Sequence, residues 1–170
     1  MKNQNGVGLM EVIIALLLLA ISVLGYSLLQ YRSLEAGGQA LKKVEAMNLA
    51  RNLGERMYVN RIAYKDIYKS GINKKGNVES CKYYSDKMNY CAFEDFAKKD
   101  LADIALLAQD KNMRIAVLPC PNTKNGRSCI YVAWDETLAS QSDGDDNVAC
   151  TNVKEFTYKA QAKCIVVEAY

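Results

Sequence analysis

The chain has 170 residues, which is enough for one compact domain with an accessory element and too few for two ordinary domains. Its net charge of +3 at pH 7 does not require a polyanionic partner. Because the sequence contains no histidine, Ser-His-Asp and Cys-His catalysis are excluded, and we expect a protein that is not an enzyme and needs no cofactor.

The amino-terminal segment is strongly apolar. Residues 12–24 are apolar with one exception, and residues 1–30 carry only two charges. A helix over residues 7–29 would be about 34 Å long, which is enough to cross the hydrocarbon core of a membrane. The sequence therefore predicts a single membrane-spanning helix near the amino terminus.

One of these two charges, Glu11, distinguishes between kinds of membrane segment. A carboxylate inside such a segment is costly, and a plain membrane anchor gives no reason for it. An ordinary secretory signal peptide would need a polar region with small residues after its apolar stretch. Here that stretch ends in Gly-Tyr-Ser-Leu-Leu-Gln at residues 25–30, so both interpretations fit poorly.

Residues 6–11 read Gly-Val-Gly-Leu-Met-Glu and resemble the prepilin signature, usually written G-F-T-L-I-E. Val7 stands where Phe is usual, and Gly8 stands where Thr or Ser is usual. The resemblance, to minor type IV pilins of the PilV kind, implies that prepilin peptidase cuts between Gly6 and Val7 and that Val7 is then N-methylated. It also implies that Glu11 pairs with the Val7 amine of a neighbouring subunit and sets axial register during assembly.

The chain is expected to contain four segments in order. Residues 1–6 form the leader, 7–30 a membrane or fibre-core helix, 31–60 an amphipathic stem and 61–170 a globular head. No proline occurs before Pro119, so one helix from about residue 7 to residue 60 is predicted, roughly 80 Å long, with Gly37-Gly38 as its weak point. Apolar residues of the stem recur at helical spacing: Leu41, Val44, Met47, Leu49, Leu53 and Met57.

A basic stripe follows the stem. Arg61, Lys65 and Lys69 share one helical face beside Tyr64 and Tyr68. Such a stripe could bind DNA through phosphate contacts and stacking. A solvated basic face with tyrosines packed on the head is the simpler interpretation, because charge runs usually serve solvation.

The head combines a short helix with strands. Residues 92–109 have a helical apolar stripe, expected to pack in the core, made of Phe93, Phe96, Leu101, Ile104, Ala105 and Ala108. Strands are predicted at 113–118, 129–135, 155–159 and 163–168. The expected fold class is α+β, with a long helix packed on an antiparallel sheet of about four strands, and the resemblance implies the lollipop form of pilins.

Six cysteines lie outside the apolar segment, and an even count in an exported chain indicates disulfides. Six cysteines allow fifteen pairings, and pairing of nearest neighbours closes three small loops. That scheme joins Cys81 to Cys91, Cys120 to Cys129, and Cys150 to Cys164. The last of these loops resembles the disulfide-bounded loop of type IV pilins.

Metal sites are the alternative for these polar and sulfur-bearing residues. Zinc fits poorly, because no cysteine pair has C-x-x-C spacing and histidine is absent. Residues 143–147, Asp-Gly-Asp-Asp-Asn, have the oxygen density of a calcium loop but lack the spacing and the distal glutamate of an EF-hand. An exposed acidic turn is the preferred interpretation, and no metal is expected.

The sequence thus predicts a structural subunit of a type IV pilus. The resemblance implies that its partners are prepilin peptidase, other minor and major pilins and the inner-membrane assembly platform. It implies a single-pass inner-membrane protein of a bacterium that later enters an extracellular pilus, with adhesion or twitching motility as roles. Two alternatives remain: a minor pseudopilin of a type II secretion system, and a DNA-binding pilin in DNA uptake.

Overall fold

The computed structural model of the chain forms two compact units, Met1–Leu41 and Lys42–Tyr170, which we call the first and the second unit. The boundary between them falls inside the predicted stem. The residues that the structure describes are 8–63, 92–123, 126–144, 148–154 and 156–169.

The described part of the first unit is formed by the beginning of helix α1, Leu9–Val59. A helix of this extent was expected, and no proline interrupts it. It remains helical through Gly37 and Gly38. Every described residue of the first unit is exposed, including all of its large apolar side chains. Such a surface is compatible with lipid or with other helices, and unfavourable in water.

Among the described residues, the second unit contains three helical elements. They are the remainder of α1, the short 3₁₀ helix η1, Arg61–Ala63, and helix α3, Phe93–Asp110. The part of α1 in this unit buries a stripe of residues three and four positions apart: Ala46, Leu49, Ala50, Leu53 and Met57. Leu41, Val44 and Met47, which also belong to the apolar series of the stem, are exposed by 62%, 57% and 42%.

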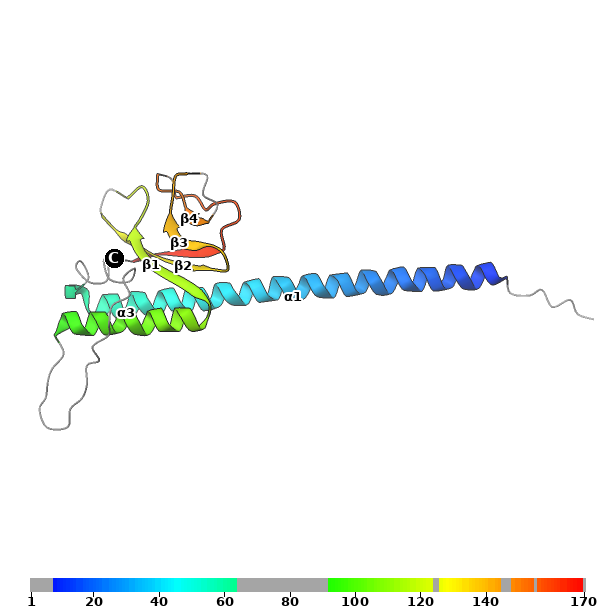
Figure 1. Ribbon diagram of the computed structural model, residues 1–170, viewed down its shortest axis with the longest axis horizontal. Helices are drawn as coiled ribbons and strands as arrows, with labels where there is room; N and C mark the ends of the chain where they lie inside the picture. The colour runs from blue at the N-terminus through cyan, green and yellow to red at the C-terminus, as the bar shows by residue number, and fades with distance from the viewer. Residues whose placement is uncertain (1–7, 64–91, 124–125, 145–147, 155, 170) are drawn as a thin grey trace, which may run out of the picture. The chain divides into compact units, whose positions relative to one another are not determined.

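Three strands form an antiparallel sheet in the order β1-β2-β5 (Figure 1). They are β1, Met113–Pro119, β2, Ser128–Trp134, and β5, Cys164–Ala169. The central strand β2 is buried along its whole length, as expected for a strand paired on both edges and covered on both faces. Two shorter strands, β3, Leu138–Gln141, and β4, Ala149–Thr151, pair in parallel as a separate layer.

The two faces of the sheet cover two different cores. Ile130, Val132 and Trp134 of β2 pack with the buried stripes of α1 and α3. Tyr131 and Ala133, which alternate with them, pack on the other face with the cysteines. This period of two is the ordinary property of a strand, and here both sets of side chains are buried.

One predicted strand is absent. Residues 156–159 contribute only an isolated bridge between Thr151 and Tyr158, so the described residues form an antiparallel sheet of three strands instead of about four. Polar and apolar residues do alternate in the sequence of 155–159. Its described residues, however, lie beside β4 and not in the antiparallel sheet. The strands β3 and β4, four and three residues long, were not predicted.

The buried face of α3 also differs from the prediction. Leu101, Ile104 and Ala108 are buried as expected, whereas Phe93 and Phe96 are exposed by 62% and 54%. Ala105 is exposed as well. The buried face instead includes Ala97 and an acid, Asp100. The acid is tolerated there because Arg56 Nη1 of α1 lies 2.7 Å from its Oδ1 atom.

Candidate functional site

Glu11 lies in the first turn of α1, where its backbone N–H donates to the carbonyl of Gly8 at 2.8 Å. It is the single acidic residue in the stretch from residue 9 to residue 29. Within the described part of the chain its carboxylate makes no ion pair. The helix is long and apolar enough to cross a membrane, and the most apolar window is 0% buried. A carboxylate placed on such a surface needs a polar partner from outside the described residues.

Several predicted site residues lie outside the described part of the chain. Gly6 and Val7, the expected cleavage and methylation positions, are among them. The same holds for Lys65 and Lys69 of the basic stripe, and for the Cys81–Cys91 pair. The first member of the stripe is described: the Arg61 guanidinium lies 5.7 Å from the centroid of the Tyr58 ring, a cation–π geometry.

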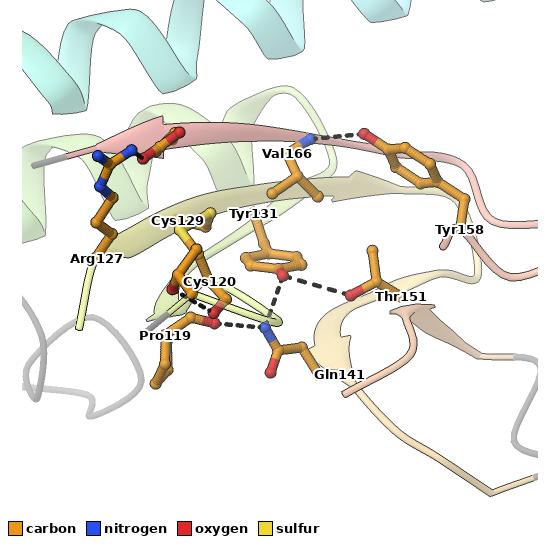
Figure 2. The surroundings of a disulfide bond; sticks show 11 residues. Pro119, Cys120, Arg127, Cys129, Tyr131, Gln141, Thr151, Tyr158 and Val166 are labelled. Atoms are coloured by element: carbon orange, nitrogen blue, oxygen red, sulfur yellow. Dashed lines mark hydrogen bonds and ion pairs between the residues drawn. A yellow bond between two sulfur atoms is a disulfide. The ribbon is translucent and has the colours of Figure 1, made fainter. Parts of the chain in front are cut away.

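Disulfides join Cys120 to Cys129 and Cys150 to Cys164, two of the nearest-neighbour pairs. The first closes the turn between β1 and β2, as Figure 2 shows. The second connects β4 to the first residue of β5. All four cysteines are buried, and they belong to the core on the face of the sheet away from the helices.

A buried polar group connects the two layers of strands beside these disulfides (Figure 2). The Tyr131 side chain is 0% exposed, and its hydroxyl accepts a hydrogen bond from Gln141 Nε2 at 2.6 Å. The same Gln141 amide donates to the Pro119 carbonyl at 2.7 Å, and Thr151 Oγ1 lies 3.4 Å from the tyrosine hydroxyl. These bonds satisfy a polar group that would otherwise destabilise the second core.

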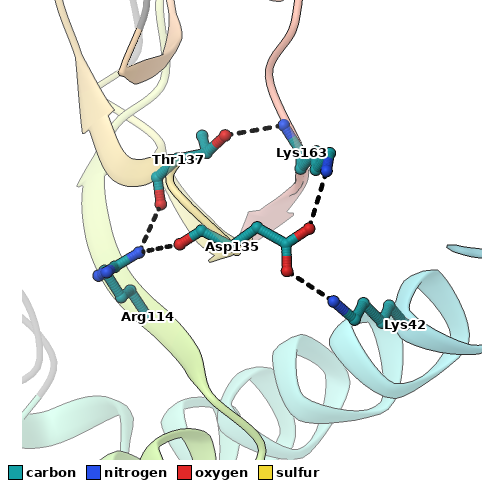
Figure 3. A network of polar contacts seen from close by, with 5 residues as sticks. All are labelled: Lys42, Arg114, Asp135, Thr137 and Lys163. Carbon is teal, nitrogen blue, oxygen red and sulfur yellow. Dashed lines mark hydrogen bonds and ion pairs between the residues drawn. The ribbon is translucent and has the colours of Figure 1, made fainter.

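A cluster of charges surrounds Asp135, directly after β2 (Figure 3). Its carboxylate accepts hydrogen bonds from Lys42 Nζ of α1 at 2.6 Å and from Lys163 Nζ at 2.9 Å. The bond from Lys42 and then the bond from Lys163 hold the pKa of Asp135 below its usual value of 3.8. We call these three side chains the Asp135 cluster.

The backbone around the Asp135 cluster is fixed as well. Arg114 Nη1 donates to the carbonyls of Asp135, at 2.7 Å, and Thr137, at 3.1 Å. The Thr137 hydroxyl accepts a hydrogen bond from the N–H of Lys163. Asp135 itself has φ of 54°, a left-handed conformation that Asp and Asn adopt more readily than most residues. The turn therefore connects α1, β1 and the segment before β5.

Two family models match the amino-terminal part of the chain. Residues 1–27 match the prokaryotic N-terminal methylation motif, and residues 28–102 match type IV pilin Tt1218. These two segments are therefore similar to the methylation motif and to a type IV pilin domain. Neither the curated proteins nor the solved structures contained a match.

The pilin match covers a limited part of the fold. It begins at Leu28 in α1 and ends at Ala102 in α3, so every strand that the structure describes lies beyond it. The exposed apolar helix with Glu11 falls within the methylation motif and the start of the pilin match. The two matches thus support a subunit of a pilus or pseudopilus, which is a structural role.

The predicted acidic turn is partly described. Asp143 Oδ1 accepts hydrogen bonds from the backbone N–H groups of Val153, at 2.8 Å, and Lys154, at 3.2 Å. Residues 145–147 of the turn lie outside the described part of the chain. Among the described residues no group of three or more His, Cys, Asp or Glu side chains is arranged to hold a metal ion.

The interactions that organise the strands of this chain were not predicted from its sequence. Asp135 and Tyr131 were assigned to a strand, without partners. The Asp135–Lys42 contact joins residues 93 positions apart, and no local pattern indicates a contact of that range. A weak signal existed in Asp135 and Thr137, since short polar residues directly after a strand favour a turn.

Proposed function

We propose that this chain is a minor pilin of the PilV kind: a non-catalytic subunit that is inserted in the inner membrane and then incorporated into a type IV pilus. The methylation motif and the type IV pilin match support it, together with the extent of α1. Its partners would be other minor and major pilins and the inner-membrane assembly platform.

The observation that carries the proposal is the surface of the first unit. From Leu9 to Leu29 the large apolar side chains of α1 are exposed by half or more of their area, and Glu11 is the one acidic group among them. Burying such side chains contributes roughly 25 cal/mol for each Å² of apolar surface. Lipid would cover this surface before assembly, and the helices of other pilins would cover it in the fibre.

Processing supplies the polar partner in this proposal. Cleavage by prepilin peptidase between Gly6 and Val7 would create a new amine four residues before Glu11. In the fibre, the Glu11 carboxylate of one subunit would accept hydrogen bonds from the Val7 amine of its neighbour. N-methylation keeps that amine cationic, so the pair would be charge-assisted.

Mass spectrometry of the amino terminus in sheared fibres tests the proposal. We expect the mature chain to begin at N-methyl-Val7, six residues shorter than the sequence. Replacing Gly6 by Leu should leave the full-length chain in the inner membrane, whereas replacing Gly8 by Ser, the residue usual in the signature, should leave processing intact. An assembled chain that begins at Met1 would contradict the proposal.

A second candidate is a minor pseudopilin of a type II secretion system, because both family matches fit it equally. The two functions predict different losses. Deleting a minor pilin should reduce the number of surface pili and with it adhesion or twitching motility. Deleting a pseudopilin should leave pili intact and trap secreted proteins in the periplasm.

A further inference from the structure

Three side chains at the far end of the apolar stretch differ from those before them. Tyr26 and Tyr31 are 64% and 65% exposed, and the Arg32 side chain is 73% exposed. Arg32 Nη1 lies 3.5 Å from Glu35 Oε2. Glu35 is about one turn after Arg32 in α1, on the side away from the apolar stretch. Tyrosine and arginine are the residue types that concentrate where a membrane helix meets water.

These side chains surround the helix instead of sharing one face. At about 100° per residue, Tyr31 is rotated by about 140° from Tyr26, and Arg32 by about 240°. A protein partner contacts one face of a helix and would favour residues on that face. A layer of lipid headgroups contacts all faces equally. Tyrosine is suited to this layer because its ring is apolar and its hydroxyl is polar. The positive charge of arginine is complementary to the negative charge of lipid phosphates.

The position of Glu11 agrees with the same arrangement. Twenty residues separate Glu11 from Tyr31 in α1, which corresponds to about 30 Å along the helix axis. The hydrocarbon core of a bilayer is also about 30 Å thick. With Tyr31 at one boundary of the hydrocarbon, Glu11 therefore lies at the other.

We propose that Tyr31 and Arg32 anchor α1 in the outer phospholipid headgroup layer and thereby hold Glu11 at the inner boundary of the hydrocarbon, with Tyr26 about 7.5 Å deeper, at the upper end of the acyl chains. This inference rests on the membrane insertion in the proposed function and deepens it. A charge at this boundary reaches water and headgroups, and so costs much less than a charge at the bilayer centre. Glu11 then needs its partner amine only when the subunit leaves the membrane for the fibre.

Depth-dependent quenching of tryptophan tests this arrangement. The full chain is reconstituted in phosphatidylcholine vesicles whose acyl chains carry bromine either near the headgroup or near the bilayer centre. Three variants, Val12→Trp, Ile21→Trp and Tyr31→Trp, report on three depths. Wild-type protein gives the baseline, because its single tryptophan, Trp134, is buried in the second unit.

We expect shallow bromine to quench more than deep bromine in the Val12→Trp and Tyr31→Trp variants, and the reverse for Ile21→Trp. Stronger deep than shallow quenching for Val12→Trp would overturn the inference, because Glu11 would then lie in the hydrocarbon. No quenching in any of the three variants would show that α1 is not inserted, and would contradict the membrane part of the proposed function instead.

A second measurement tests whether Tyr31 and Arg32 set the depth. In the Leu34→Trp variant the tryptophan lies about 4.5 Å beyond Tyr31, outside the hydrocarbon, and we expect little quenching. Changing Tyr31 and Arg32 to Leu in that background lengthens the apolar stretch, so the helix should shift and shallow quenching should increase. Unchanged quenching would show that these residues do not anchor the helix.

Discussion

Helix α1 has two environments within one element. In the first unit, every described residue from Gly8 to Leu41 is exposed, although most of the residues between Leu9 and Leu29 are apolar. In the second unit the same helix buries one stripe of five residues against α3 and the sheet. Leu41 and Leu53 show the contrast directly, because one is 62% exposed and the other is 0% exposed.

The difference shows that apolar composition and burial are separate properties. The first unit is the more apolar of the two, yet its own chain covers none of its described residues. The second unit has fewer apolar residues in its helix, but they recur three and four positions apart and meet a sheet. An apolar stretch without such a partner therefore indicates a surface that is completed by lipid or by other subunits.

The contrast predicts opposite outcomes for the same substitution at the two leucines. Leu53→Ala removes a fully buried side chain and should lower the free energy of unfolding by about 3–5 kcal/mol, including the cost of the cavity. Leu41→Ala should change it by less than about 0.5 kcal/mol. Denaturant unfolding of the full chain in detergent, followed by the fluorescence of buried Trp134, measures both. Equal losses for the two variants would contradict the contrast.

The second unit also depends on covalent links that the first unit lacks. Changing Cys150 and Cys164 together to Ser opens a loop of sequence separation 14 and should lower the free energy of unfolding by about 2–3 kcal/mol. Hydrogen exchange should also increase in β3 and β4, because this disulfide holds β4 against β5.

The matched control changes Cys120 and Cys129 to Ser. That pair has a sequence separation of 9 and lies within the β1–β2 turn, so a similar loss of stability is expected without faster exchange in β3 and β4. Faster exchange of the two short strands in both variants would show that Cys150–Cys164 has no special role in holding this layer.

In the first unit, the charge of Glu11 should matter for assembly and leave cleavage unchanged. Glu11→Gln keeps the size and the hydrogen-bonding groups of the side chain but removes its charge, so a pair with the Val7 amine of a neighbour is lost. We expect normal processing and about a tenfold decrease in the variant recovered from sheared pili, equivalent to about 1.4 kcal/mol. Glu35→Gln is the matched control. Because Glu35 lies beyond the apolar stretch, we expect this variant to enter the pilus normally. Wild-type recovery of Glu11→Gln would mean that helix packing alone sets register.

Much of the fold could be predicted because its signals are local. The absence of proline and the apolar pattern predicted α1 and α3, and alternation predicted β1, β2 and β5. The short strands β3 and β4 gave no such signal. They pair in parallel through contacts such as Leu138 with Ala149. Too few residues alternate in a strand of three or four for its pattern to be recognised.

The residues of the candidate site also differ in whether the sequence alone predicts their environment. Glu11 could be singled out because one carboxylate in an apolar run conflicts with its surroundings. The buried acid of α3, Asp100, could not, because its burial depends on Arg56 of another helix. Phe93 and Phe96 show the opposite case. Their apolar character predicts burial, although both are exposed. Interactions between distant elements therefore account for most of what the sequence did not predict.

The smallest predicted effect concerns the Asp135 cluster, which holds α1 to the sheet at the start of the second unit. Lys42 and Lys163 keep the pKa of Asp135 in the folded state below its usual value of 3.8. The carboxylate therefore contributes stability above about pH 4, and this contribution is lost as the pH falls through the lowered pKa. Because the side chain is about one-third exposed, solvent screening limits the contribution to about 0.5–1 kcal/mol.

Asp135→Asn isolates this contribution. Asparagine also tolerates the left-handed backbone at this position, where φ is 54°, so the substitution removes charge without adding strain. We expect the variant to be less stable than wild type by about 0.5–1 kcal/mol at pH 7, and the difference to disappear as the pH falls through the lowered pKa of Asp135. High salt should reduce the difference at pH 7, because the Debye length falls to about 3 Å in 1 M salt. A difference that stays constant from pH 7 down through the titration of Asp135 would mean that Asp135 acts through its backbone turn and not through its charge.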